Sequence, residues 1–132
     1  MAERLLSCYD MTHEFPIASV GGDDIREGYG IGLNAAGACV PADHASAVVT
    51  LGRAAYITPN GNWQSEQGIF CWANSEENSL TAVGQYAYWE DDGTVGNDSD
   101  NNFAGIVYRI DEYGVWVLSR FDLSAPPAGN GD

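Results

Sequence analysis

Short apolar runs separated by turn residues dominate this sequence, and they limit the folds open to it. Sixteen glycines and five prolines are spread over 132 residues, and clusters of Gly, Pro, Asn and Asp interrupt any long helix. The runs between these clusters are rich in β-branched and aromatic residues, which is typical of strands. The sequence contains neither heptads nor a repeat of fixed period. The pattern therefore predicts an all-β fold, either a small β-sandwich or a partly open barrel.

Turn signals divide the first two thirds of the chain into expected strands. Turns are predicted over residues 21–24, 34–37, 59–62 and 90–93, where Gly, Asn, Asp and Pro gather. The strands predicted between and beside them cover residues 17–20, 28–33, 38–40, 45–51, 54–58, 68–73 and 85–89. The glycines of GYGIGL, at residues 28–33, are interpreted as strand bends or a bulge, because their spacing does not fit a nucleotide-binding loop.

The clearest element is a hairpin over residues 104–121. Two β-rich runs, AGIVYRI and VWVLSRF, flank a short acidic turn that contains Gly114. In the first strand, strict alternation places Ile106, Tyr108 and Ile110 on one face and Val107 and Arg109 on the other. In the second strand it places Val115, Val117 and Phe121 on one face and Trp116, Leu118 and Arg120 on the other. Both faces carry apolar groups, whereas a sheet with one face in water alternates more cleanly. We therefore expect each face to be covered, by a second sheet or by another subunit.

The remaining organisation is simple. One β domain is predicted over residues 17–123, a usual size for a single domain. Residues 1–16 are predicted to form an N-terminal arm or an edge strand, and Pro16 limits any helix there. The small, Pro- and Gly-rich residues 124–132 predict a flexible C-terminal tail.

Charge excludes several classes of partner. The chain has 19 acidic and five basic residues, a formal net charge of −14, and no Lys. Nucleic-acid binding needs clustered basic residues, and anionic membranes repel such a chain, so neither is expected. The acidity serves either solubility or the display of many copies on a surface that faces solvent. Because the sequence shows neither a signal peptide nor a membrane span, we expect synthesis in a cytoplasm.

No pattern predicts catalysis, a cofactor or a metal site, and the protein is not expected to be an enzyme. Cys8, Cys39 and Cys71 suit neither a disulfide framework nor a zinc site, so buried, reduced thiols are expected. His13 and His44 begin no metal-binding motif, and no serine lies in a GxSxG elbow.

The acidic loops resemble a calcium site only in part. Asp98, Asp100 and Asn102 match the start of a calcium loop, but Phe103 and Arg109 occupy the positions that require Gly and Glu. A looser oxygen cage is the alternative to a solvated loop, which we favour; its candidate ligands are Glu90, Asp91, Asp92, Asp98 and Asp100.

The four tryptophans have two interpretations. They form either a platform on which sugars stack or part of the core and interfaces, where large aromatics concentrate. Alternation favours the core for Trp89 and Trp116, whereas Trp63 and Trp72 are not diagnostic.

Several segments resemble small bacteriophage capsid cement (decoration) proteins. GQYAYWEDDGTV, at residues 84–95, resembles the family's G-x-x-V-Y-W-D-x-x-G-x-V segment, and the final strands at residues 103–121 follow in the family's order. ASAVVTLGRAAYI, at residues 45–57, resembles its V-x-L-x-G-V-F strand pair, and residues 21–40 resemble its opening β segment. The sequence departs from the family in its longer stretch over residues 60–83, in Gly52-Arg53-Ala54-Ala55, and at both termini.

The resemblance implies a structural virion protein, without enzyme activity or cofactor, that binds the outer surface of a phage head. Its partners would be the major capsid protein and, in a homotrimer, further copies of itself. The residues predicted to contact the capsid or a subunit are Arg4, Leu5, Leu6, Tyr9 and Trp116.

Three other functions stay open. A carbohydrate-binding β module would use an exposed Trp63 or Trp72. A head or tail completion protein would be present in few copies per particle. A small hydrolase would bring an exposed His44 close to Cys39 in a cleft.

Overall fold

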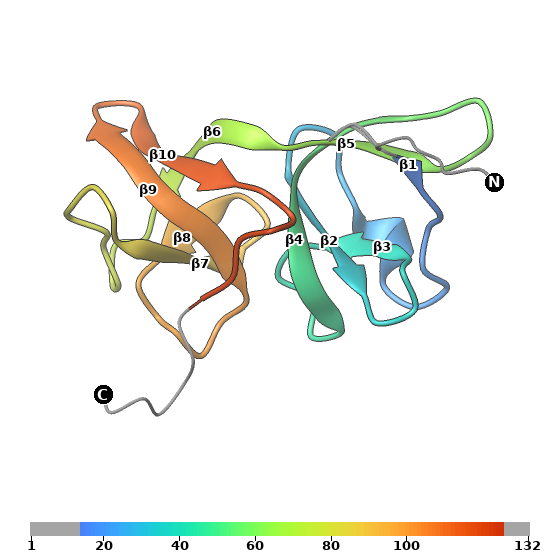
Figure 1. Ribbon diagram of the computed structural model, residues 1–132, viewed down its shortest axis with the longest axis horizontal. Helices are drawn as coiled ribbons and strands as arrows, with labels where there is room; N and C mark the ends of the chain where they lie inside the picture. Colours follow the sequence, from blue (N-terminus) through green and yellow to red (C-terminus); the bar gives the residue numbers. More distant parts are fainter. Residues whose placement is uncertain (1–13, 126–132) are drawn as a thin grey trace, which may run out of the picture.

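The computed structural model describes residues 14–125, and its strands form two units that lie side by side (Figure 1). The first unit is a five-stranded sheet in the order β1-β5-β4-β2-β3, and the second is a closed barrel in the order β10-β6-β8-β7-β9. The all-β prediction is confirmed: among the described residues the only helix is a 3-10 turn, Gly22–Asp24. Within that part of the chain, no helix is long and apolar enough to cross a membrane.

The first lobe is the sheet formed by the N-terminal half of the chain. Its strands are β1 (Glu14–Phe15), β2 (Gly30–Asn34), β3 (Cys39–Pro41), β4 (Ala47–Ile57) and β5 (Trp63–Glu66). Together they enclose a core cluster of Ile25, Ile31, Leu33, Cys39, Leu51, Ala54 and Trp63.

Residues 14–18 bring the two edges of the first lobe together. Glu14 and Phe15 pair with β5, and the next residues reach β3, where the Cys39 N–H donates to the Pro16 carbonyl at 2.7 Å. The Ala18 N–H in turn donates to the Cys39 carbonyl at 3.0 Å. The lobe is therefore a partly open barrel. The end of the predicted arm or edge strand, residues 14–15, is an edge strand.

The barrel contains the C-terminal half of the chain. Its strands are β6 (Gly68–Asn74), β7 (Tyr86–Asp91), β8 (Thr94–Gly96), β9 (Phe103–Asp111) and β10 (Gly114–Ser119). Trp72 and Trp89 meet edge to face in its core, with ring centroids 4.9 Å apart, and Val107, Val115 and Val117 are buried with them. Because the sheet closes on itself, it leaves no free strand edge.

The strand predictions needed correction in three places. The strand predicted over residues 17–20 does not form, because Ile17 makes only an isolated bridge to Cys39 and residues 19–21 are a turn. The separate strands predicted over residues 45–51 and 54–58 are one strand, β4, which passes through Gly52 with a φ of 88°. Strands β5 and β8 were not predicted. Polar residues in Trp63–Glu66 and the shortness of Thr94–Gly96 hide them in the sequence.

The predicted hairpin forms from β9 and β10, but its faces differ from strict alternation. Trp116 pairs with Arg109 and Val117 pairs with Val107, so Tyr108 is an extra residue in β9. This β-bulge reverses the alternation beyond it. The prediction that Ile106, Tyr108 and Ile110 share a face is therefore wrong: Ile110 packs against the barrel core, whereas Ile106 and Tyr108 do not belong to it.

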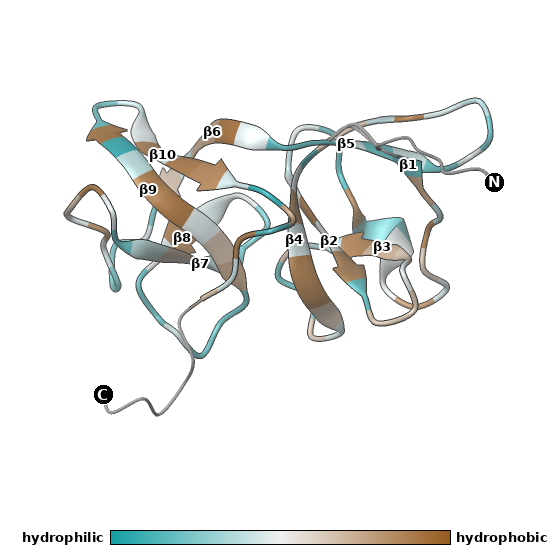
Figure 2. Cartoon of the chain, in the orientation of Figure 1, coloured by the Kyte–Doolittle hydropathy of each residue, from teal (hydrophilic) through white to brown (hydrophobic). Residues whose placement is uncertain are grey.

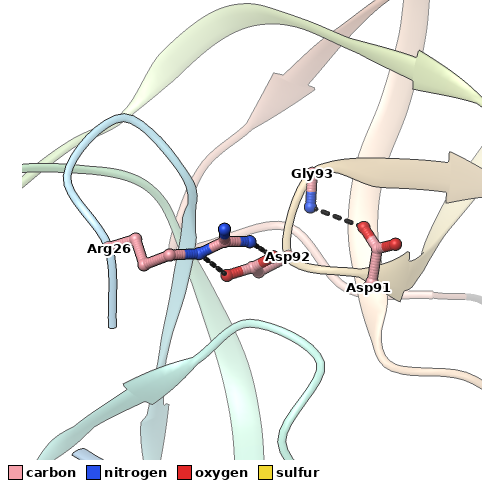
Figure 3. A network of polar contacts seen from close by, with 4 residues as sticks. All are labelled: Arg26, Asp91, Asp92 and Gly93. Carbon is pink, nitrogen blue, oxygen red and sulfur yellow. Dashed lines mark hydrogen bonds and ion pairs between the residues drawn. The ribbon is translucent and has the colours of Figure 1, made fainter. Parts of the chain in front are cut away.

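An ion pair connects the two lobes. Arg26 precedes β2, and its guanidinium binds both carboxylate oxygens of Asp92 in the turn between β7 and β8, at 2.7 and 3.4 Å (Figure 3). The ring of Tyr29 lies 3.8 Å from the guanidinium carbon. The Asp92 carbonyl also accepts from the Gly30 N–H at 2.6 Å. Neighbouring Asp91 accepts from the Gly93 N–H, which shapes the same turn.

Asn102 makes the second connection. Its side-chain amide donates to the Ala42 and His44 carbonyls, at 2.9 and 2.8 Å. These bonds hold the loop after β3 against the barrel, where Ala42 joins the barrel core. Gly30 lies so close to Trp89 that a Cβ there would be 2.6 Å from the indole ring. The two lobes therefore share a packed, hydrogen-bonded junction.

Candidate functional site on the outer face of the barrel

A row of apolar side chains crosses four strands on the outside of the barrel. Leu118 of β10 lies directly opposite Ile69 of β6 on one side and Ile106 of β9 on the other. Ile106 in turn lies opposite Tyr86 of β7. Directly opposite residues project from the same face of a sheet, so the four form one continuous row. We name Ile69, Leu118, Ile106 and Tyr86, together with Trp116, the outer barrel face.

Alternation within each strand explains why these side chains point outward. Ala87 and Val117, the neighbours of Tyr86 and Leu118, are fully buried in the barrel core. Ile69 and Tyr86 are 40% and 41% exposed, and Leu118 and Ile106 are half-buried. Apolar residues run along β6, β9 and β10 (Figure 2). The barrel strands are thus apolar on the side that faces the core and on the side that faces out.

Trp116 occupies a second row beside the first. It lies opposite Cys71 and Arg109, and the Arg109 guanidinium stands 5.0 Å from the centroid of its ring. The indole N–H donates to Asp111 at 3.0 Å, and Asp111 also pairs with Arg109 at 3.1 Å. The half-buried indole is therefore held in one orientation by two charged neighbours.

The charge of Asp111 is stabilised by this arrangement. Desolvation alone would raise the pKa of Asp111, but it is outweighed by hydrogen bonds from Trp116 and the Tyr113 N–H and by the Arg109 charge, so the pKa is lowered. Asp111 thus stays ionised at neutral pH and keeps both Trp116 and Arg109 in place. Trp and Arg are among the residues that dominate binding energy at protein interfaces.

The predicted contact residues fall in two groups. Trp116 lies on the outer barrel face, whereas Arg4, Leu5, Leu6 and Tyr9 lie outside the described residues. Ile69 and Tyr86 were not predicted as contacts. Their signal in the sequence is the apolar content of GIFCWA and QYAYW, at residues 68–73 and 85–89, where both faces of a strand carry large side chains.

The tryptophans named for sugar stacking lie in the interior. Trp63 is 6% exposed in the core of the first lobe, and Trp72 is 5% exposed in the barrel. Trp89 is also buried, as alternation predicted. The same prediction of a core position is wrong for Trp116, which is half-buried outside the barrel core. A sugar-binding platform built on Trp63 or Trp72 therefore has no exposed ring.

The cysteine named as a nucleophile lies in the core as well. Burial raises the pKa of Cys39 to about 12, and its thiol points to the Phe15 carbonyl, with the sulfur 3.8 Å from the oxygen. Nucleophilic catalysis needs the thiolate, which Cys39 does not form at neutral pH. His44 instead contacts the Ser46 hydroxyl at 2.9 Å. The proposed Cys39–His44 hydrolase thus lacks an activated, accessible nucleophile.

The acidic loop residues are engaged separately. Asp92 binds Arg26, Glu90 accepts from the Asn78 amide at 2.9 Å, and Asp98 accepts from the Asp100 N–H at 3.0 Å. Over residues 14–125, no three His, Cys, Asp or Glu side chains gather as metal ligands would.

A polar recess of about 310 Å³ lies beside the lobe junction. Asp24, Arg26, Asp43, His44 and Asp92 line it. Burial, followed by the negative charges of Asp92 and Asp91, raises the pKa of Asp43 despite a backbone hydrogen bond and His44, which lower it. Arg26 and Asp92 are paired with each other in this recess, and their ion pair belongs to the junction between the lobes.

Comparison with protein-family models, with curated proteins and with solved structures finds no match to this chain.

Proposed function

We propose that this chain is a structural protein that docks through its outer barrel face onto the outer surface of a phage head, as a capsid cement protein. The observation that carries the proposal is the row of Ile69, Leu118, Ile106 and Tyr86, which is apolar, continuous across four strands and turned away from both cores. Contiguous apolar surface of this kind marks interaction sites in proteins that otherwise cover their apolar groups. The resemblance of residues 84–95 and 103–121 to cement proteins supports the choice of partner.

The energetics suit a docking surface. Complete burial of one large apolar side chain contributes roughly 1.5–3 kcal/mol, and aromatic and arginine residues commonly supply the largest single contributions at an interface. Tyr86, Trp116 and Arg109 provide such residues beside the aliphatic row. Since Trp116 is already oriented by Asp111, little side-chain entropy is lost when a partner covers it.

Net charge favours a different protein as the docking partner. Each chain carries a formal charge of −14, so two copies repel one another at long range, whereas a neutral or basic partner surface is attracted. In the proposed virion the homotrimer would therefore form on the shell, where contacts with the major capsid protein bring the copies together. The acidic remainder of each copy would face solvent.

The proposed effect on the shell follows from mass action. A protein that binds only the assembled lattice stabilises it by about 2.7 kcal/mol per site when its free concentration is 100 times the Kd. Added over many sites, this contribution raises the temperature at which the shell breaks. Catalysis has no part in this function.

The test is binding of the purified chain to phage heads that lack it, measured by co-sedimentation. We expect Ile69→Asp and Tyr86→Asp to weaken binding at least tenfold, because each places a carboxylate in the apolar row. Both side chains are partly exposed, so the variants should keep the fold, which circular dichroism checks. Val20→Asp is the matched control: Val20 is 73% exposed in the first lobe, and we expect binding at the wild-type level.

Copy number separates this proposal from a completion protein. We expect hundreds of copies per intact particle and a lower breakage temperature for particles without the chain. A handful of copies would assign the chain to head or tail completion instead. Equal stability of particles with and without it would contradict the cement function.

A further inference from the structure

A small groove lies between the two lobes. Its walls are residues 47–50 of β4, Phe103 at the start of β9, and Leu123 in the segment that follows β10. The volume of the groove is about 160 Å³. An apolar cavity of roughly 150 Å³ is large enough to admit benzene, so this groove has the size of one phenyl ring.

The lining of the groove is uncharged. None of the ten residues that line it is acidic or basic, although the chain as a whole carries 24 charged Asp, Glu, Lys and Arg residues, 19 acidic and five basic. Alanine, valine, leucine and phenylalanine side chains form most of its surface, with Asn102 fixed at one side by its bonds to Ala42 and His44. A charged group would lose its hydration there without gaining a partner.

The groove continues the outer barrel face. Phe103 forms part of its wall, and the same ring packs beside Tyr86 with centroids 6.1 Å apart. Tyr86 is the last member of the apolar row. A partner that covers the row therefore reaches the groove without crossing an acidic segment.

We propose that the groove receives one phenylalanine-type side chain of the shell protein on which the outer barrel face docks. This inference rests on the proposed function and adds the anchor of the interface. A large apolar side chain inserted into a matching pocket is the usual centre of binding energy at an interface. The wall formed by Phe103 supplies an aromatic edge for such a ring.

Toluene tests the groove by itself. In NMR titrations we expect toluene to shift the Val48, Val49 and Thr50 signals of the wild type in a saturable manner. We expect no such shifts in Ala47→Phe, which fills the groove. If wild-type signals do not shift, or if Ala47→Phe responds equally, the groove does not accept a ring and the inference fails, whatever the heads bind.

Binding to phage heads tests the assigned occupant. We expect Ala47→Phe and Val48→Asp to weaken binding at least tenfold, with Val20→Asp as the matched control for the second variant. Val48 is 63% exposed at the lip of the groove, so Val48→Asp tests the inference even if Ala47→Phe fails to fold. If the wild type binds heads and Val48→Asp binds equally, the anchor is wrong and the cement function stands. If the wild type does not bind, the proposed function itself fails.

A second copy of the chain is the competing occupant. Tyr113, at the tip of the β9–β10 hairpin, is 74% exposed and could supply the ring. Sedimentation velocity should show the wild type as a monomer at micromolar concentration. Self-association that disappears in both Tyr113→Ser and Val48→Asp would assign the groove to a second copy and overturn the proposal.

Discussion

Cys39 shows how position alone determines the chemistry of a side chain. The sequence offers it as a free thiol in a segment that also contains His44, a pair of residue types that many hydrolases use. In the structure Cys39 is fully buried between Ile31, Leu33 and Trp63 in the core of the first lobe. Desolvation makes its ionisation unfavourable. The same thiol that could act as a nucleophile at a surface is here a small apolar core residue.

Because Cys39 is buried, we expect the free energy of unfolding to fall as the pH rises into the alkaline range. The pKa of Cys39 is about 12 in the folded chain against 9.0 for an unperturbed thiol, so the unfolded chain loses its proton first as pH rises. The stabilisation is complete below pH 9 and is lost progressively between pH 9 and 12.

Between pH 8 and pH 10 the free energy of unfolding should fall in the wild type. In Cys39→Ala we expect this fall to be smaller by about 1 kcal/mol. Urea denaturation of both proteins at the two pH values measures it. Cys71→Ala is the control, because Cys71 is only half-buried and its removal should change this pH dependence less. If the free energy of unfolding falls equally in the wild type and in Cys39→Ala, the pH dependence does not come from Cys39.

The four tryptophans likewise differ in their surroundings, although they are the same residue type. Trp63, Trp72 and Trp89 are buried, and only Trp116 lies on an outer face with its N–H satisfied by Asp111. Their residue type is identical, and the strand alternation around Trp89 and Trp116 is similar. What distinguishes Trp116 is that both of its neighbours, Val115 and Val117, are buried in the barrel core, so the alternation of β10 turns its side chain outward.

At the scale of elements, β4 depends on a single glycine. Gly52 has a φ of 88°, and a Cβ there would be 2.3 Å from the Glu66 carbonyl oxygen of β5. The register between β2 and β4 shifts beside it, between Ile31 and Gly32. The strand therefore continues through Gly52 only because this residue tolerates a left-handed conformation and leaves space for the neighbouring backbone.

Gly52→Ala should lower the free energy of unfolding by about 2–4 kcal/mol, since backbone strain and the collision with β5 add together. Gly61→Ala is a matched control, because Gly61 has a φ of 81° but nothing within 4 Å of its Cβ position. For that variant we expect a loss of about 1 kcal/mol, from strain alone. Equal losses in urea denaturation would show that the contact with Glu66 does not matter.

At the scale of the whole molecule, the junction determines whether the two lobes unfold together. The ion pair between Arg26 and Asp92, the bond from Gly30 to the Asp92 carbonyl and the two bonds from Asn102 all cross it. Ala42 also extends from the first lobe into the barrel core. We therefore expect one cooperative unfolding transition for the chain.

Asn102→Ala should lower stability by about 2 kcal/mol, because the buried Ala42 carbonyl and the His44 carbonyl lose their donor together. Native-state hydrogen exchange should then show earlier opening of residues 42–47 than in the wild type. Asn97→Ala is the control: its exposed amide makes one bond of 3.3 Å, to the Ser79 carbonyl, so a change below about 0.5 kcal/mol is expected. Unchanged exchange at residues 42–47 in Asn102→Ala would contradict the role of the junction.

The sequence alone predicts the all-β class, the final hairpin and the apolar groups on both faces of that hairpin. These features are local: turn residues set where strands end, and β-branched and aromatic residues set which segments become strands. The paired runs of residues 104–110 and 115–121 need no distant partner to be recognised. The acidity, from which we expect no nucleic-acid partner, is likewise a property of composition.

Which apolar residues face outward depends on the tertiary structure. The bulge at Tyr108 turns Ile110 into the core and leaves Ile106 outside, and the closure of the barrel joins Ile69 to Tyr86 through Leu118 and Ile106. Register and closure depend on pairings between segments far apart in the chain, and one inserted residue exchanges the two faces of a strand. For that reason an apolar outer face could be predicted for the β9–β10 hairpin. That Ile69 of β6 and Tyr86 of β7 extend this face could not be predicted.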